Sequence, residues 1–245
     1  MDGWVRILAV PLLLLAGRFV RGRVGQFDPP VSVERSPRCA NLTLAVVAWG
    51  VLTPAVFGVN LLSNWVVTRT GGVPDTHPLV SIGSTDRTID VFVFLLATCV
   101  LVPLAEEFVF RGVLIPWATR KRYGPVILLV VAGVFVASES RTPTGWRVAP
   151  VVFVGLLGLG LILLYKLSKI RSRFPIRTTT AVYSTAALFA TVHTGVWPTP
   201  VPLFLLGLGL GYLVARTRSI LPAVVVHGLF NAVSALLVLR GQTGG

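Results

Sequence analysis

Charged residues are scarce in this sequence. They make up 13% of its 245 residues, whereas a soluble globular domain contains about 25%. Hydrophobic residues account for 54% of the chain, and its apolar segments are close to the roughly 20 residues that span a bilayer as a helix. This composition excludes an ordinary soluble domain and predicts an all-α fold, a polytopic bundle of transmembrane helices.

Acidic residues are fewer still. The chain has nine of them against 22 Lys and Arg residues, which gives a net charge of +13. The excess does not indicate a nucleic-acid partner, because the basic residues fall mostly in short connections between apolar segments and no basic stripe with interleaved aromatic residues occurs. Basic connections are instead typical of membrane proteins, whose cytoplasmic loops are rich in Lys and Arg.

Cysteine is almost absent. The two cysteines, Cys39 and Cys99, form neither a CxxC motif nor any other spacing typical of a zinc site. A disulfide framework is therefore not expected, and both are interpreted as packing residues. No Ser/His or Cys/His combination stands out as a covalent catalytic pair.

Eight apolar segments are candidate transmembrane helices, at about 4–20, 41–67, 89–118, 125–138, 148–167, 179–194, 199–215 and 219–239. The first is short, so a signal peptide is an alternative. Arg18, Arg21 and Arg23 follow it, however, where a small-residue cleavage site would lie, which favours a retained helix. The repeated glycines from Gly207 to Gly211 predict close helix packing.

Basic residues alternate between the two sides of this arrangement. The connections after the first, third, fifth and seventh segments are the more basic ones, and the positive-inside rule places them in the cytoplasm. Residues 21–40 then form a cytoplasmic linker, residues 68–88 form an external loop, and both termini face outward. We expect a multi-pass protein of the cell membrane, in contact with membrane lipid.

Three ionisable residues, Glu106, Glu107 and Arg111, lie inside the third segment. A charge at the bilayer centre costs roughly 2.5–3.5 kcal/mol, so each of them is expected to have a partner. Glu107 and Arg111 are four residues apart and can pair on one helix face, while Glu106 points about 100° away. An ion pair that only fixes helix packing accounts for Glu107 and leaves Glu106 unexplained.

Two histidines also lie in apolar segments. His193 follows Phe189 by four residues and His227 precedes Asn231 by four, so each pair can share a helix face. Each histidine alone is more often a core residue than a catalyst. Together with the two glutamates and the arginine, they make a polar set on three different helices.

This set suits the hydrolysis of a peptide bond. A carboxylate in a low-dielectric environment is a better base, so Glu106 could activate water with help from a histidine. A histidine and an asparagine amide four residues apart could donate hydrogen bonds to one oxyanion. Glu106, His193 and His227 could instead ligate a divalent metal such as zinc, which would then activate the water. The sequence leaves both routes open.

Three motifs in order carry a resemblance to a known family: "EEFVFRG" from Glu106, Phe189-x-x-x-His193, and "HGLFN" from His227 to Asn231. The pattern resembles the CAAX protease and bacteriocin-processing (CPBP) family of intramembrane proteases, which includes Rce1-type prenyl-protein endopeptidases and prokaryotic Abi proteins. The resemblance covers roughly residues 95–240.

The resemblance implies roles for six catalytic residues: a water-activating base and its assistant (Glu106, His193), a supporting pair (Glu107, Arg111) and an oxyanion hole (His227, Asn231). Members of the family are described both as metal-dependent and as glutamate-type peptidases, so a metal stays an open alternative. The second motif follows the first at a longer distance than is usual in the family.

Two regions are therefore expected. Residues 1–88 would hold N-terminal helices with the cytoplasmic linker and the external loop. Residues 89–240 would hold the protease core, with an extra two-helix insertion around 125–178. The expected function is an intramembrane endopeptidase acting on a membrane-associated peptide or protein, in CAAX-type or bacteriocin processing. A non-catalytic immunity or scaffold protein is the alternative, and a proton-relaying transporter is a third interpretation.

Overall fold

The computed structural model describes residues 38–75, 88–139, 148–167 and 175–243. Every regular element in these ranges is a helix, and they contain no strand, which confirms the all-α class. The apolar segment at 4–20 lies outside the described residues, and so do residues 21–37 of the linker predicted at 21–40; their structures stay predictions. The last three residues of that linker, from Arg38, already belong to α2. The described helices all belong to one compact unit, Ser36–Gly245.

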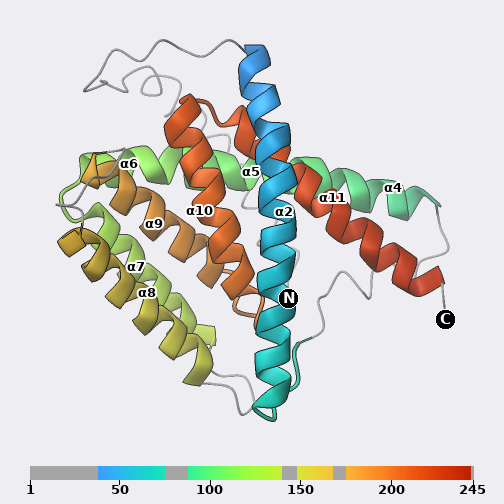
Figure 1. Cartoon of the computed structure of the whole chain (residues 1–245), viewed down its shortest axis with the longest axis horizontal. Coiled ribbons are helices and arrows are strands. Elements are labelled where there is room, and N and C mark those ends of the chain that lie inside the picture. Colours follow the sequence, from blue (N-terminus) through green and yellow to red (C-terminus); the bar gives the residue numbers. More distant parts are fainter. Residues whose placement is uncertain (1–37, 76–87, 140–147, 168–174, 244–245) are drawn as a thin grey trace. The chain divides into compact units, whose positions relative to one another are not determined.

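Figure 1 shows the helices in their order along the chain. Their bounds are α2 (Arg38–Arg69), α4 (Thr88–Leu96), η1 (Ala97–Leu101), α5 (Val102–Glu107), η2 (Phe108–Leu114), α6 (Ile115–Arg120), α7 (Gly124–Glu139), α8 (Val148–Leu167), α9 (Ile176–Thr191), α10 (Pro200–Thr217) and α11 (Leu221–Thr243). The seven apolar segments predicted from residue 41 onward all coincide with these helices to within a few residues at either end.

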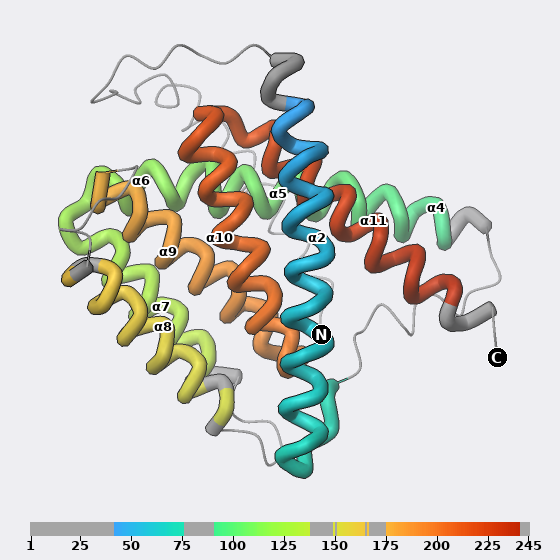
Figure 2. The backbone as a smooth tube through the Cα atoms, viewed as in Figure 1, coloured from blue at the N-terminus to red at the C-terminus, as the bar shows by residue number. Residues whose placement is uncertain are grey.

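The elements from α4 to α6 make one continuous rod, which Figure 2 shows as an uninterrupted coil. Two stretches of it, η1 and η2, are π-helical. The N–H of Val102 bonds the carbonyl of Ala97, and the N–H of Ile115 bonds that of Phe110, five residues back in both cases. The α-helical segment that carries Glu106 and Glu107 lies between these two stretches.

Each π-helical stretch ends two residues before a proline, at Pro103 and Pro116. Proline has no backbone N–H, so the carbonyls one turn earlier lose their donor and the helix is distorted there. The apolar pattern alone does not predict these distortions, although the two prolines mark them in the sequence. Single π turns within α-helices are frequent at functional sites.

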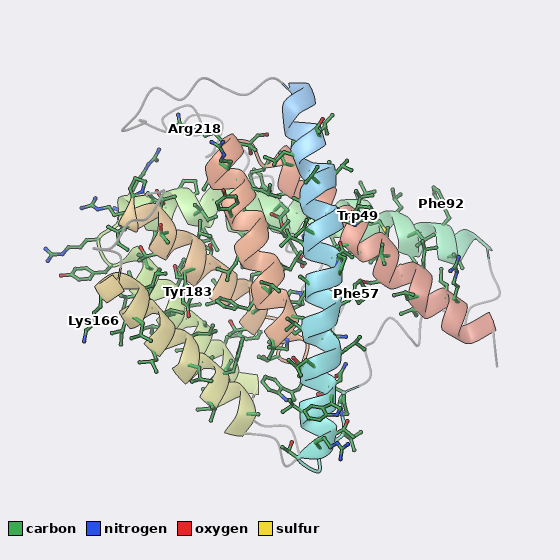
Figure 3. The ribbon with its side chains drawn as sticks, viewed as in Figure 1. Trp49, Phe57, Phe92, Lys166, Tyr183 and Arg218 are labelled. Atoms are coloured by element: carbon green, nitrogen blue, oxygen red, sulfur yellow. The ribbon has the colours of Figure 1, made fainter. Side chains whose placement is uncertain are left out.

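Four helices of the described part are long and apolar enough to cross a membrane: Leu42–Arg69, Val91–Arg120, Pro200–Thr217 and Leu221–Arg240. Two shorter apolar helices, Gly124–Ala137 and Val151–Leu164, accompany them. The count of eight spans is thus not confirmed. Large apolar side chains such as Phe92, 61% exposed, point away from the protein (Figure 3), as expected for a surface that meets lipid.

Helix α9 is not among the candidate spans because it is short and rich in Thr and Ser. It packs against α6, α7, α8 and α10, and ten of its 16 residues are buried. The hydroxyls of Thr180, Ser184 and Thr185 each bond a carbonyl four residues earlier in the same helix. A helix enclosed by protein, with its hydroxyls satisfied in this way, does not need an apolar surface.

Helix α10 lies between α9 and α2 and touches both (Figure 1). A Cβ atom on Gly207 would lie 3.1 Å from the Cα of Ala186 on α9, and one on Gly209 would lie 2.5 Å from Leu52 on α2. The glycines therefore let the helices approach closely, which confirms the packing predicted for them. Two clusters of buried apolar residues fill the contacts, one among α2, α10 and α11 and one among η2, α6, α7 and α9.

Candidate active site

The best-buried charges of the described chain are Glu107 and Arg111, whose side chains are 0% and 1% exposed. Nη1 of Arg111 lies 2.8 Å from Oε1 of Glu107. Its Nη2 donates to the carbonyl of Gly207 on α10 at 3.3 Å, and the guanidinium lies 4.6 Å from the ring centroid of Phe189 on α9. The pairing expected from the four-residue spacing is present, and Arg111 links η2 to two neighbouring helices.

His227 is attached to this pair. Its Nδ1 lies 2.9 Å from Oε1 of Glu107, across 120 residues of sequence. Because Glu107 is already paired with Arg111, its carboxylate can only accept, and Nδ1 of His227 therefore donates. This fixes the ring so that Nε2 faces Glu106, 3.6 Å from Oε2.

His193 approaches Glu106 from the other side. It lies in the turn after α9, which ends two residues earlier, at Thr191. Its Nδ1 lies 2.8 Å from the carbonyl oxygen of Phe189; a carbonyl only accepts, so Nδ1 carries the hydrogen. Nε2 is left to face Oε1 of Glu106 at 3.9 Å.

Glu106 thus lies between the Nε2 atoms of two histidines that come from different parts of the chain. Its side chain is 26% exposed and that of His193 31%, whereas Glu107 is fully buried. The adjacent glutamates therefore occupy opposite environments: Glu107 is ion-paired in the core, and Glu106 is partly exposed between two imidazoles. Contacts of 3.6–3.9 Å are too long for direct hydrogen bonds, and they suit a bridging water.

Asn231 lies one turn beyond His227 and contacts η1 instead of Glu106. Its Nδ2 donates to the carbonyl of Thr98 at 2.9 Å. Thr98 precedes Pro103 by five residues, so in the π-helical register this carbonyl has lost its backbone donor, and the Asn231 amide replaces it. The amide carries a second N–H, so the predicted part of Asn231 in an oxyanion hole stays a prediction.

Gly228 allows α11 to reach the same distorted stretch. A Cβ atom at this position would lie 2.5 Å from the carbonyl oxygen of Cys99, which is four residues before Pro103. Any larger residue beside His227 would push α11 away from η1. The glycine of the "HGLFN" motif therefore has a packing role that the spacing of polar residues does not reveal.

A family model described as type II CAAX prenyl endopeptidase Rce1-like matches residues 88–173 and 162–233. Together the two stretches cover more than half of the chain. The chain belongs to this family. No curated protein and no solved structure matches it.

Membership of the Rce1-like family indicates an endopeptidase that is an integral membrane protein and acts on a peptide or protein at the membrane. The six residues of the motifs all fall inside the matched range, and the structure gathers Arg111, His193 and His227 around Glu106 and Glu107. The sixth, Asn231, supports the helix that carries both glutamates.

The metal alternative can be compared with this geometry. Both histidines present Nε2 toward Glu106 and are oriented through Nδ1, an arrangement typical of metal ligands. Within the described residues, however, no group of three or more His, Cys, Asp or Glu side chains is placed so that it could hold a metal ion.

The Asn231 amide bonds a carbonyl that lacks a backbone donor because of Pro103, and a double-mutant cycle of these two residues tests this relation. Asn231→Ala leaves the Thr98 carbonyl unpaired, which is expected to cost about 1–3 kcal/mol. Pro103→Ala restores a backbone N–H that can bond within the helix, so in that background Asn231→Ala is expected to cost less than half as much. The free energy of unfolding in detergent, measured for the four proteins of the cycle, checks this.

Cleavage by the same four proteins separates the two roles of Asn231. A support role predicts that activity lost in Asn231→Ala returns in part when Pro103→Ala is added. An amide that binds the oxyanion predicts equal loss in both backgrounds. Equal stability costs in both backgrounds would show that the amide does not compensate for the proline.

Proposed function

We propose that this Rce1-like protein hydrolyses a peptide bond of a membrane-associated peptide or protein with a water activated by Glu106. The observation that supports this most directly is the position of the Glu106 carboxylate between the two Nε2 atoms of His193 and His227. Glu107 and Arg111 neutralise each other in the core, so Glu106 is the carboxylate left for chemistry.

The first step is the attack of water on the scissile carbonyl. A water held between Glu106 and Nε2 of His193 gives one proton to the Glu106 carboxylate as its oxygen bonds the carbonyl carbon. Nε2 of His193 can accept a hydrogen bond from the same water, because its Nδ1 hydrogen is directed to the Phe189 carbonyl. Together they position the water and remove its proton.

The second step is collapse of the tetrahedral intermediate. The carbon–nitrogen bond breaks, and the proton taken up by Glu106 passes to the leaving amine, which restores the carboxylate. During both steps the carbonyl oxygen carries negative charge. His227 can stabilise that charge through Nε2–H when both of its nitrogens are protonated, while Nδ1 stays bound to Glu107. The second N–H of the Asn231 amide is the further donor suggested by the family motif.

The substrate class follows from the location of the site. Glu106 lies on an apolar helix long enough to cross a membrane, so the scissile bond is presented at or within the bilayer. A CAAX-type tail and a bacteriocin-like precursor both meet this requirement. A scaffold or immunity protein would use the buried set of Glu107, Arg111 and His227 for packing, but it would have no need for a partly exposed Glu106 between two imidazoles.

Chelation tests the proposed route. The purified protein in detergent is given a library of membrane-anchored peptides, with and without prenyl groups, and the products are identified by mass spectrometry. Water activation by Glu106 predicts that cleavage survives a strong chelator with less than a twofold change. Loss of cleavage that zinc restores would contradict it. A wild-type protein that cleaves no peptide would favour the scaffold alternative.

A further inference from the structure

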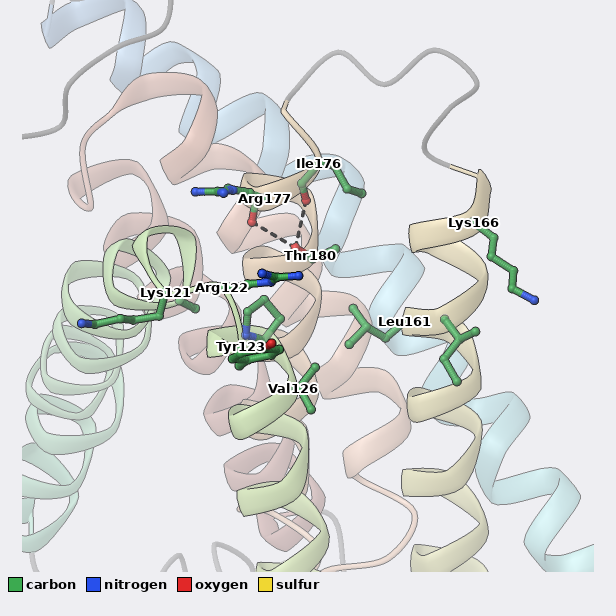
Figure 4. Close-up of a pocket in the computed structure, with 12 residues that line it drawn as sticks. Lys121, Arg122, Tyr123, Val126, Leu161, Lys166, Ile176, Arg177 and Thr180 are labelled. Atoms are coloured by element: carbon green, nitrogen blue, oxygen red, sulfur yellow. Dashed lines mark hydrogen bonds between the residues drawn. The ribbon is translucent and has the colours of Figure 1, made fainter.

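A cavity of about 630 Å³ lies away from the candidate active site, where the turn after α6 meets α7, α8 and α9 (Figure 4). Its lining residues are Ala118, Lys121, Arg122, Tyr123, Pro125, Val126, Leu161, Ile162, Lys166, Ile176, Arg177 and Thr180. Ligand pockets commonly measure about 300–1,000 Å³. None of the six motif residues lines it, so it belongs to a different site.

The lining is positively charged. Four of the twelve residues are basic and none is acidic. Arg122 lies over the ring of Tyr123, 5.5 Å from its centroid. Figure 4 shows the Arg122 side chain near the centre and Arg177 above it, with the Lys121 and Lys166 ammonium groups on opposite flanks, directed outward. Lysine has a long flexible side chain, so both ammonium groups can turn toward a bound anion.

The remainder of the lining is apolar. Val126 on α7 and Ile162 on α8 are 52% and 55% exposed, and both belong to the shorter apolar helices of the structure. Leu161 on α8 also lines the cavity and is 8% exposed (Figure 4). The cavity therefore offers cations at the helix ends and an apolar surface that continues along α7 and α8.

The same four cations lie in or directly beside the connections that the positive-inside rule assigns to the cytoplasm: Lys121 and Arg122 follow α6, Lys166 is near the end of α8, and Arg177 is near the start of α9. Three more basic residues, Lys169, Arg171 and Arg173, follow Lys166 in the sequence. Basic pockets between transmembrane helices on the cytoplasmic side are typical binding sites for anionic lipid headgroups. A guanidinium matches the geometry of a phosphate by donating two parallel hydrogen bonds.

We propose that this cavity binds an anionic phospholipid of the membrane. The phosphodiester headgroup lies among Arg122, Arg177 and the two lysines, and one acyl chain runs along the apolar surface of Val126 and Ile162. This site does not depend on the peptidase proposal, because it shares no residue with the motifs and its occupation is measured without any cleavage.

Native mass spectrometry of the detergent-purified protein tests the headgroup. Phosphatidylglycerol and phosphatidylcholine with identical acyl chains are titrated in parallel. Removing one cation near a membrane-bound headgroup weakens binding roughly fivefold, so Lys166→Gln/Arg177→Gln is expected to weaken phosphatidylglycerol binding about 25-fold. The control Arg69→Gln/Arg216→Gln removes two exposed cations outside the cavity and is expected to change binding less than twofold.

A second comparison separates the lipid from a soluble anion. Val126→Trp and Ile162→Trp fill the apolar side and are expected to weaken phosphatidylglycerol at least fivefold, while a large excess of inorganic phosphate does not displace the lipid. Equal binding of the two lipids, equal effects of the two double variants, or displacement by inorganic phosphate would each overturn the proposal. The melting temperature of each variant is measured as a control, and it is expected to stay close to that of the wild type, so that a loss of lipid binding is not caused by unfolding.

Discussion

Glu106→Gln is expected to lower kcat by about 10²–10⁴-fold, the usual contribution of a general base, and to leave a slow residual cleavage. Glutamine keeps the size of the side chain and can still accept a hydrogen bond from water, but it cannot take up a proton. Because Glu106 makes only long contacts with the two histidines, the substitution breaks no short hydrogen bond. The melting temperature should therefore stay within a few degrees of wild type.

Kinetics of the variant can be separated into binding and chemistry. A missing base lowers kcat while KM stays within about threefold, since the substrate is bound by other groups. His193→Ala added to Glu106→Gln is expected to lower the residual rate by less than twofold, as both side chains act on the same water.

Glu107→Gln serves as the contrasting control. It changes the neighbouring residue in the same way, but at a fully buried position that holds Arg111 and His227. Its expected effect is a lower melting temperature together with a loss of activity. If Glu106→Gln cleaved at the wild-type rate, or if its melting temperature fell as far as that of Glu107→Gln, the role of the base would have to be given to another residue.

The helices could be predicted from hydropathy because lipid and protein core both select apolar side chains. Seven predicted segments correspond to helices of the structure. Helix α9 shows where this reasoning weakens. Its surroundings are protein, so hydropathy does not mark it as a span, and the prediction of eight spans relied on an apolar pattern that α9 shows only weakly.

The site residues could be identified because a charged side chain inside an apolar segment is energetically costly, so it indicates a partner or a function at that position. The four-residue spacing correctly paired Glu107 with Arg111. Their partners were not predictable by spacing, since the contacts of Arg111 with Gly207 and of His227 with Glu107 join distant parts of the chain. Asn231 shows the limit most clearly: its nearest acceptor is a carbonyl left free near a proline, and no helical face pattern indicates that contact.

The positions of the two histidines relative to Glu106 could not be predicted from the sequence either. His193 lies near the end of the predicted segment 179–194, and His227 lies near the start of the segment 219–239. Both histidines nevertheless lie close to Glu106. Figure 1 shows the reason: the rod from α4 to α6 runs across α2 and α10 instead of alongside them. A count along parallel helices therefore misjudges which residues can meet.

Arg111→Met is expected to have the largest effect on stability. It removes one partner of a fully buried ion pair and leaves Glu107 with His227 alone, which is expected to cost about 3–5 kcal/mol. The carbonyl of Gly207 and the face of the Phe189 ring lose their cationic partner as well. Unfolding in detergent with increasing denaturant, followed by circular dichroism, measures the loss.

The size of the loss depends on the charge that stays behind, and a double variant shows this. In Glu107→Gln/Arg111→Met no unpaired carboxylate remains in the core, so stability should recover by about 1–2 kcal/mol relative to Arg111→Met. Arg216→Met, at an exposed arginine of α10, should change stability by less than about 0.5 kcal/mol. A double variant no more stable than Arg111→Met would mean that Arg111 acts through Gly207 and Phe189. In that case the arginine would hold η2 against α9 and α10 whatever the charge of Glu107.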